Sequence, residues 1–214
     1  MPDRVQSTRL RGGDLPYPGG RIIHAKSDYA AVAVGTPRLI ESGRSNRSSW
    51  TVHAASTPGY GIFMAGPEPS KSGQAAESLA ADVLNLKPLS QEHDPNHSML
   101  SDHFTAEVAG STLWWTGDSG NCSLFVVTST DEVHQLASAA KGSIRSEQLD
   151  QGDRAVFVSE SMTDALSNID LALEMALGDD PTPAASCTWL LDAADDDGAC
   201  EGMFVAIWRA SLAV

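Results

Sequence analysis

Short runs of β-forming residues, separated by turn residues, dominate the first third of the chain. Glycine, proline, serine and asparagine separate four such runs, at 21–24, 31–34, 50–53 and 61–64. Runs of this length with this punctuation are typical of antiparallel strands. The preceding segment, residues 1–20, has turn-forming sequences without hydrophobic periodicity. We therefore predict a flexible N-terminal arm over residues 1–20 and a single domain over residues 21–214.

A helical period replaces the β pattern in the middle of the chain. Apolar residues recur at three- or four-residue spacing over residues 72–86, and the Lys87-Pro88 dipeptide ends this pattern. A weaker helical pattern runs through Met99, Phe104 and Val108. We predict a helix over 72–86 and a second, less regular helical segment through these three residues.

Strand signals return in the second half of the chain. Residues 112–115 and 122–127 flank the turn sequence Gly117-Asp118-Ser119-Gly120, and this arrangement predicts a hairpin. A further apolar run follows at 154–158. The last strand is expected over 203–208, where bulky residues alternate.

Two helices are expected between these last strands. Ser161 and Asp164 have the spacing of a capping box, and an apolar stripe follows them up to Leu177. A second helix is predicted over 184–194. Because strands and helices occur in blocks, the order favours an α+β fold in which helices cover antiparallel sheet layers.

Composition narrows the class of protein. The 214 residues include 42% hydrophobic and 20% charged residues, as in ordinary globular proteins. Lys and Arg number 14 against 28 Asp and Glu, which gives a formal net charge of −14. This balance argues against nucleic-acid binding, since phosphates are neutralised by clustered Lys and Arg. No apolar run approaches the roughly 18 residues of a membrane helix.

The cysteines and the start of the chain predict a cytoplasmic location. Three widely spaced cysteines, Cys122, Cys187 and Cys200, fit neither a disulfide framework nor a zinc ribbon, and we expect free thiols. The polar start after Met1 lacks the apolar core of a secretory signal.

Three blocks of the sequence resemble the PPM family, the metal-dependent protein phosphatases of the 2C type. Residues 111–136 resemble the strand that ends in Gly-Asp-Ser, its turn and the return strand. Residues 151–166 are similar to the Ser-Asp-Gly block, and residues 63–80 to the Asp-Gly-Met-Gly-Gly block. The three blocks occur in the family's order.

This resemblance implies a PPM/protein phosphatase 2C-like α/β sandwich. Two antiparallel β-sheets would face each other, flanked by helices near 72–86 and 161–177. Enzymes of this family hold two divalent cations between the sheets with carboxylates, and a water that bridges the cations attacks the phosphoryl group.

The chain departs from the family at the metal-binding positions. Ala65, followed by Gly66, stands where the family has the aspartate that bridges both metals. Glu160 replaces the metal-binding aspartate of the Ser-Asp-Gly block, and Asp118 of the Gly-Asp-Ser sequence is expected to close its turn by an Asx-type hydrogen bond. We therefore predict a vestigial site around Ala65, Gly66, Asp118 and Glu160.

Other candidate site residues have two interpretations each. Arg44 is either the phosphate-binding arginine of the family or a solvated surface residue. Asp197, with the two preceding aspartates, either binds a cation or belongs to a solvated acidic run. In an active enzyme, Glu160 and Asp197 would be metal ligands.

The resemblance and its departures together predict a pseudophosphatase without a cofactor. It would act in bacterial signalling by binding a protein partner such as a kinase or a phosphoprotein, and it would bind neither nucleic acid nor membrane. The alternative is an active, divergent serine/threonine phosphatase that uses Mn²⁺ or Mg²⁺.

The residues also allow two further hypotheses about function, a zinc site and a serine protease. His93, His97 and His103 could bind zinc. The sequence Gly117-Asp118-Ser119-Gly120, together with His53, faintly resembles a trypsin-like serine protease.

Overall fold

The structure is a computed structural model, and most of the second half of the chain is described. The described residues are 6–11, 15, 19–38, 50–57, 60–67, 104–116, 122–137, 143–179, 181–199 and 201–210. The helix predicted over 72–86 lies outside them.

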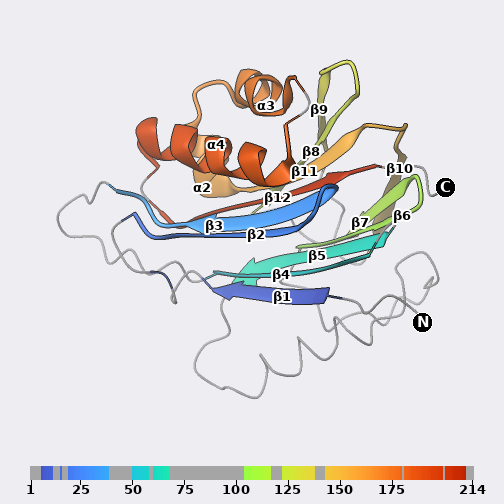
Figure 1. The fold of residues 1–214 in the computed structure, drawn as a ribbon, viewed down its shortest axis with the longest axis horizontal. Helices are drawn as coiled ribbons and strands as arrows, with labels where there is room; N and C mark the ends of the chain where they lie inside the picture. The colour runs from blue at the N-terminus through green and yellow to red at the C-terminus, as the bar shows by residue number, and fades with distance from the viewer. Residues whose placement is uncertain are drawn as a thin grey trace.

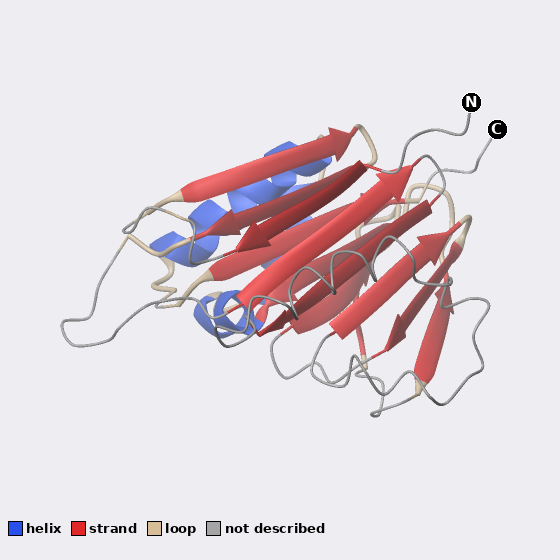
Figure 2. Cartoon of the chain, turned by 90° about the horizontal axis from the view of Figure 1, so that it is seen from below, coloured by secondary structure: helices blue, strands red, loops and turns tan. Residues whose placement is uncertain are grey.

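Two antiparallel sheets form the described part of the chain, and they face each other (Figure 1). Sheet A has the strand order β1 (Gln6–Arg11), β4 (Trp50–Thr57), β5 (Tyr60–Pro67), β6 (Phe104–Ala109), β7 (Thr112–Thr116) and β10 (Ile144–Gln148). Sheet B has the order β2 (Arg21–Ser27), β3 (Ala30–Gly35), β12 (Met203–Arg209), β11 (Arg154–Ser159), β8 (Cys122–Val127) and β9 (Val133–Leu136). The strands of both sheets run along a similar diagonal in Figure 2, as expected for aligned sheet packing.

Three described helices cover the outer face of sheet B (Figure 1). They are α2 (Glu160–Ala165), α3 (Ile169–Leu177) and α4 (Pro183–Asp196). The central strands β3, β11 and β12 are consequently buried on both faces. This explains why they read in the sequence as continuous apolar runs. None of the three helices has the length and apolar composition that a membrane crossing requires.

Aromatic contacts join the two sheets. The rings of Phe63 on β5 and Phe157 on β11 are stacked with their centroids 5.0 Å apart. Phe104 on β6 lies 5.9 Å from the same Phe157 ring. Trp208 on β12 fills the space opposite Gly61, where an added Cβ would lie 2.6 Å from two atoms of the indole ring. The close approach of β5 to Trp208 therefore requires glycine at position 61.

The structure confirms most of the predicted elements. The four early strands correspond to β2, β3, β4 and β5, and the late strands to β11 and β12. The helix predicted over 184–194 is α4. The fold class is confirmed as well, because two antiparallel sheets and a helical layer make up the described part of the chain.

Two predictions about the N-terminal half are wrong. Residues Gln6–Arg11 of the predicted arm form β1, which pairs with β4 throughout its length. The segment with Phe104 and Val108 is strand β6 and not a helix. A spacing of four residues fits one face of a helix and also one face of a strand, whereas Ala106 between them fits only the strand.

Two predictions about the second half also need correction. Strands β7 and β8 do not form a hairpin, because β7 pairs with β6 and β10 in sheet A whereas β8 pairs with β11 and β9 in sheet B. The single helix predicted over 161–177 is divided into α2 and α3. Asn168 starts α3, since its side chain accepts a hydrogen bond from the backbone N–H of Leu171 at 3.1 Å.

Candidate functional site

Three of the predicted site residues, Ala65, Gly66 and Glu160, lie where strands of both sheets end, and we call these strand ends the edge of the sandwich. Ala65 is near the end of β5 and pairs with Phe104 at the start of β6. Glu160 directly follows β11 and begins α2. Because Phe104 packs on Phe157 of β11, Ala65 and Glu160 belong to the same edge, on opposite sheets. The fold thus brings together two of the positions that the resemblance to the family identified.

The surroundings of Ala65 are apolar. Its exposed fraction is 8%, and it belongs to the cluster of buried side chains between the sheets. Its strand partners are Val52 on β4 and Phe104 on β6, which are both buried in the same cluster. Gly66 follows it and pairs with Thr51. No side-chain oxygen at position 65 is available to a cation.

Two exposed acidic residues lie at this edge, Glu201 just before β12 and Glu160 at the N-terminus of a short helix. The hydroxyls on either side of Glu160 form hydrogen bonds within the fold. Ser159 Oγ accepts a hydrogen bond from the backbone N–H of Phe204 at 3.2 Å, and Ser161 Oγ donates to the carbonyl of Gly202 at 2.7 Å.

These two hydrogen bonds correct the capping prediction. The Ser161 hydroxyl does not cap α2, because α2 already begins at Glu160. The hydroxyl of Ser161 instead donates a hydrogen bond to Gly202, in the segment before β12. The end of β11 is thereby fixed to the start of β12. Glu160 and Glu201 are the acidic residues that face solvent at this junction.

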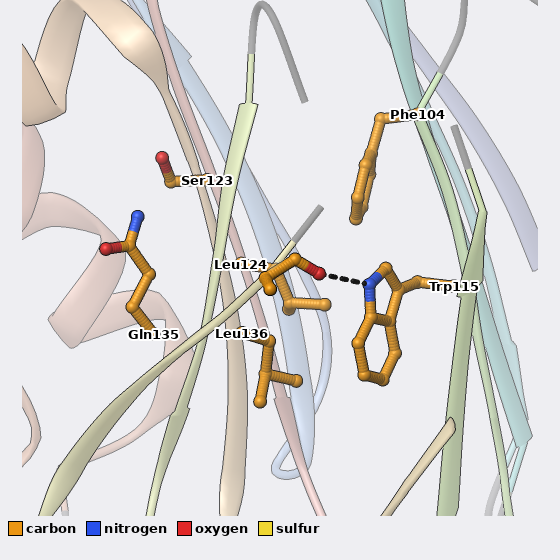
Figure 3. A pocket seen from close by; sticks show the side chains of 7 residues that line it. Phe104, Trp115, Ser123, Leu124, Gln135 and Leu136 are labelled. Carbon is orange, nitrogen blue, oxygen red and sulfur yellow. Dashed lines mark hydrogen bonds between the residues drawn. The ribbon is translucent and has the colours of Figure 1, made fainter. Parts of the chain in front are cut away.

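A cavity of about 360 Å³ lies between the sheets near this edge (Figure 3). Phe104 and Trp115 line it from sheet A, and Leu124 and Leu136 from sheet B. Figure 3 shows Ser123 and Gln135, which also line the cavity, pointing away from the two aromatic rings. The indole N–H of Trp115 donates to the carbonyl of Ala137 at 3.1 Å. The described lining is therefore mixed, apolar side chains with Ser123 and Gln135, and it contains no carboxylate of the kind that Mg²⁺ or Mn²⁺ requires.

The acidic run of α4 is divided between ion pairs and solvent. The Asp195 side chain is 1% exposed, and its Oδ2 lies 2.8 Å from Arg21 Nη2 and 3.0 Å from Arg38 Nε. Its Oδ1 accepts a hydrogen bond from the backbone N–H of Arg38 at 2.8 Å. Asp197 caps the C-terminus of α4 and is exposed. The carboxylate of Asp195 thus stabilises the packing of α4, and Asp197 lies on the helical layer.

Several predicted candidates lie outside the described residues. They are Arg44, Asp118, Ser119 and the histidines His93, His97 and His103. Their predicted roles stay predictions. Within the described ranges, no group of three or more His, Cys, Asp or Glu side chains is arranged to hold a metal ion.

The two described cysteines are not suited to nucleophilic chemistry. Cys122 at the start of β8 and Cys187 on α4 are free and buried. Burial raises the pKa of both thiols far above the ordinary value, because the interior disfavours a thiolate. Both side chains are therefore neutral thiols at neutral pH.

Thiol labelling checks this property. Treatment of the native protein with DTNB should leave Cys122 and Cys187 unmodified, and peptide mapping after unfolding in urea should find both modified. The protein at mildly alkaline pH should behave in the same way, since raised pKa values keep the thiols protonated there. Modification of either cysteine in the folded protein at the rate of a free thiol would contradict their burial.

Sequence reasoning missed the two arginines around Asp195 and the cavity between the sheets. Arg21 is 174 residues from Asp195 in the chain, and Arg38 is 157 residues from it. No local pattern could connect them. The alternation of Phe104, Ala106 and Val108 indicates a strand, but it carries no signal for a cavity beside it.

The described residues do not fit the two-metal centre that the fold implies. Such a centre needs several carboxylate oxygens directed at the same point. At this edge Ala65 contributes none, Glu160 and Glu201 contribute one carboxylate each, and Asp195 pairs with two arginines. The described residues thus contain no group of three acidic or other metal-binding side chains directed at one point.

The fold is similar to that of several solved structures. A serine/threonine phosphatase from S. agalactiae is 13% identical, with a TM-score of 0.52 over 88% of this chain and 99% of that one. RsbX in complex with magnesium is 9% identical, with a TM-score of 0.60 over 89% of this chain and 100% of that one. A Mycobacterium tuberculosis structure of RsbU and RsbW domains is 11% identical, with a TM-score of 0.55 over 92% of this chain and 63% of that one.

Neither a family model nor a curated protein matches the sequence. The likeness is therefore one of architecture, at an identity that leaves the site residues free to differ. The two facing antiparallel sheets with helices on an outer face agree with the fold that the resemblance implied. The chain has the fold of the PPM/protein phosphatase 2C-type serine/threonine phosphatases.

Proposed function

We propose that this protein is a pseudophosphatase, which has the phosphatase fold and acts by binding a protein or phosphoprotein partner. One observation carries the proposal. Ala65, at the position of the metal-bridging aspartate, is buried among Val52 and Phe104. A kinase or its phosphorylated substrate within a cytoplasmic bacterial signalling system is the class of partner that this fold suggests.

The charge balance at this edge supports the loss of catalysis. Two divalent cations bring four positive charges into a cleft, and carboxylates must offset them to make binding favourable. Among the described residues of the edge, Glu160 and Glu201 supply two negative charges against these four. The apolar side chains around Ala65 would, in addition, disfavour the hydrated ions.

One observation favours the alternative, an active but divergent metal-dependent phosphatase. Glu160 is exposed and takes part in no ion pair among the described residues, so its carboxylate is available to a cation. The neighbouring acids weigh against this function. Asp195 is engaged with Arg21 and Arg38, and its release would break buried ion pairs.

A phosphatase assay separates the two functions. Hydrolysis of p-nitrophenyl phosphate in the presence of Mn²⁺ or Mg²⁺ is expected to stay at the level of the metal-only blank. The variant Glu160→Ala should give the same result, because no metal-dependent rate exists for it to lower. A solved phosphatase of the same fold serves as the positive control. Robust hydrolysis that requires metal and disappears in Glu160→Ala would replace this proposal with the alternative.

A further inference from the structure

The helical layer carries a strong excess of negative charge. Residues 155–208 include eleven Asp and Glu and not one Lys, Arg or His. Among the described residues, arginines from other parts of the chain pair with acids of α4: Arg38 with Asp192, Asp195 and Asp196, and Arg21 with Asp192 and Asp195. The acids of α3 make no ion pair among the described residues.

Helix α3 combines this charge with exposed apolar side chains. Its inner face is buried through Ala172, Leu173, Ala176 and Leu177, which pack against α4 and sheet B. On the outside, Leu171 is 50% exposed and Met175 is 62% exposed. Their spacing of four residues places them one above the other on the helix.

Asp170 and Glu174 lie beside this apolar pair. Both are exposed and also four residues apart, so an acidic stripe runs next to the apolar stripe. Figure 1 shows α3 at the outside of the helical layer, above α4. On α4 the large side chain of Trp189 is also exposed, at 37%. The helical layer therefore offers apolar contact area in a negative field.

We propose that the outer face of α3, formed by Asp170, Leu171, Glu174 and Met175, docks a basic amphipathic segment of a partner protein. We call it the α3 face. The apolar side chains of such a segment would cover Leu171 and Met175, and its Lys or Arg side chains would pair with Asp170 and Glu174. Unbranched side chains such as methionine adapt well to a helix of varying sequence.

The charge of the α3 face decides which class of partner it fits. An exposed apolar stripe could in general bind a protein, a lipid surface or a second copy of the chain. Nucleic acids and anionic lipids are negative and would be repelled by Asp170 and Glu174. A second copy would bring a like charge to the same place, at a cost in free energy. A basic amphipathic protein segment can cover the apolar stripe and also pair with the acidic stripe.

This inference goes beyond the proposed function because it concerns the helical layer and not the strand ends. It rests on the proposed function only for the idea that the protein acts through a partner. The phosphatase assay and the binding assay are separate measurements. Metal-dependent hydrolysis by the protein would contradict the proposed function but not the binding role of the α3 face. Absence of specific peptide binding would contradict the role of the α3 face but not the proposed function.

Fluorescence anisotropy with a synthetic peptide tests the α3 face. The probe is a labelled amphipathic peptide of about 14 residues with leucine on one helical face and lysine on the other. It is titrated with the full chain at about physiological ionic strength, where distant charges are screened. The double variant L171S/M175S should weaken binding about tenfold, and D170N/E174Q should weaken it about fivefold.

A matched control separates the α3 face from general negative charge. The double variant E147Q/D150N also removes two negative charges, but from exposed acids outside the helical layer. It should change the affinity for the peptide by less than about twofold. A peptide of the same composition without amphipathic order should bind about tenfold more weakly. Circular dichroism checks that each variant is folded.

Three results would overturn the inference. Equal weakening by D170N/E174Q and E147Q/D150N would show that the peptide binds the net charge of the protein. Unchanged binding in L171S/M175S would show that the apolar stripe is not used. A dimer that dissociates in L171S/M175S, measured by light scattering, would show that a second copy covers the α3 face.

Discussion

Replacing Phe157 with alanine is expected to lower the free energy of unfolding by about 4 kcal/mol. Phe157 is 2% exposed and is the residue of sheet B on which Phe63 and Phe104 of sheet A both pack. Alanine would leave a cavity between the sheets and remove two aromatic contacts. Urea unfolding followed by circular dichroism measures the change.

The variant Phe157→Leu is the matched control. Leucine keeps most of the apolar volume but loses the ring contacts, so a loss of less than about 1.5 kcal/mol is expected. A loss below about 1 kcal/mol in Phe157→Ala would contradict the packing of β11 against β5 and β6.

Replacing Asp195 with alanine should cost about 3 kcal/mol. Asp195 is in the last turn of α4, where a negative charge is unfavourable to the helix dipole and no basic residue of the helix offsets it. Arg21 and Arg38 supply that positive charge from the other side of the packing interface. Without the carboxylate, the guanidinium of Arg21, whose side chain is 16% exposed, would lose its closest partner in a largely buried place.

The neighbouring acid provides the control for Asp195. Asp197 is exposed and makes no ion pair among the described residues, so Asp197→Ala should change the unfolding free energy by less than about 0.5 kcal/mol. Thermal or urea unfolding of both variants measures the difference. Equal effects in the two variants would show that the arginine cluster does not stabilise α4.

The sequence predicted the elements whose residues fix their own structure. The strands β3, β11 and β12 are apolar runs of strand length, and α4 begins with a proline after a threonine that caps it. These signals are local. The break between α2 and α3 was also readable, because Asn168 is a good N-cap residue, but the continuous apolar stripe concealed it.

Non-local pairing explains the elements that were predicted wrongly. The turn sequence after β7 indicated a hairpin, yet β7 and β8 find their partners in different sheets. Likewise β1 has little hydrophobic pattern of its own and is stabilised by its backbone pairing with β4. Which strand pairs with which depends on the whole core, and this information is absent from any short window of sequence.

The sequence predicted which residues lie at the candidate site but not what surrounds them. The resemblance to the family's sequence blocks identified Ala65 and Glu160, and the fold places both at one edge. It could not show that Asp195 is occupied by Arg21 and Arg38, because these residues meet only through the packing of α4 on sheet B.

Direct measurement of Mn²⁺ binding tests the central claim, that this edge lacks the oxygen ligands for a pair of cations. Protein purified without chelator is dialysed against Mn²⁺ and the bound metal is counted by atomic emission, with Glu160→Ala in parallel. We expect no saturable binding up to about millimolar Mn²⁺, and no difference between the two proteins. Saturable binding of two Mn²⁺ per chain, lost in Glu160→Ala, would contradict the account.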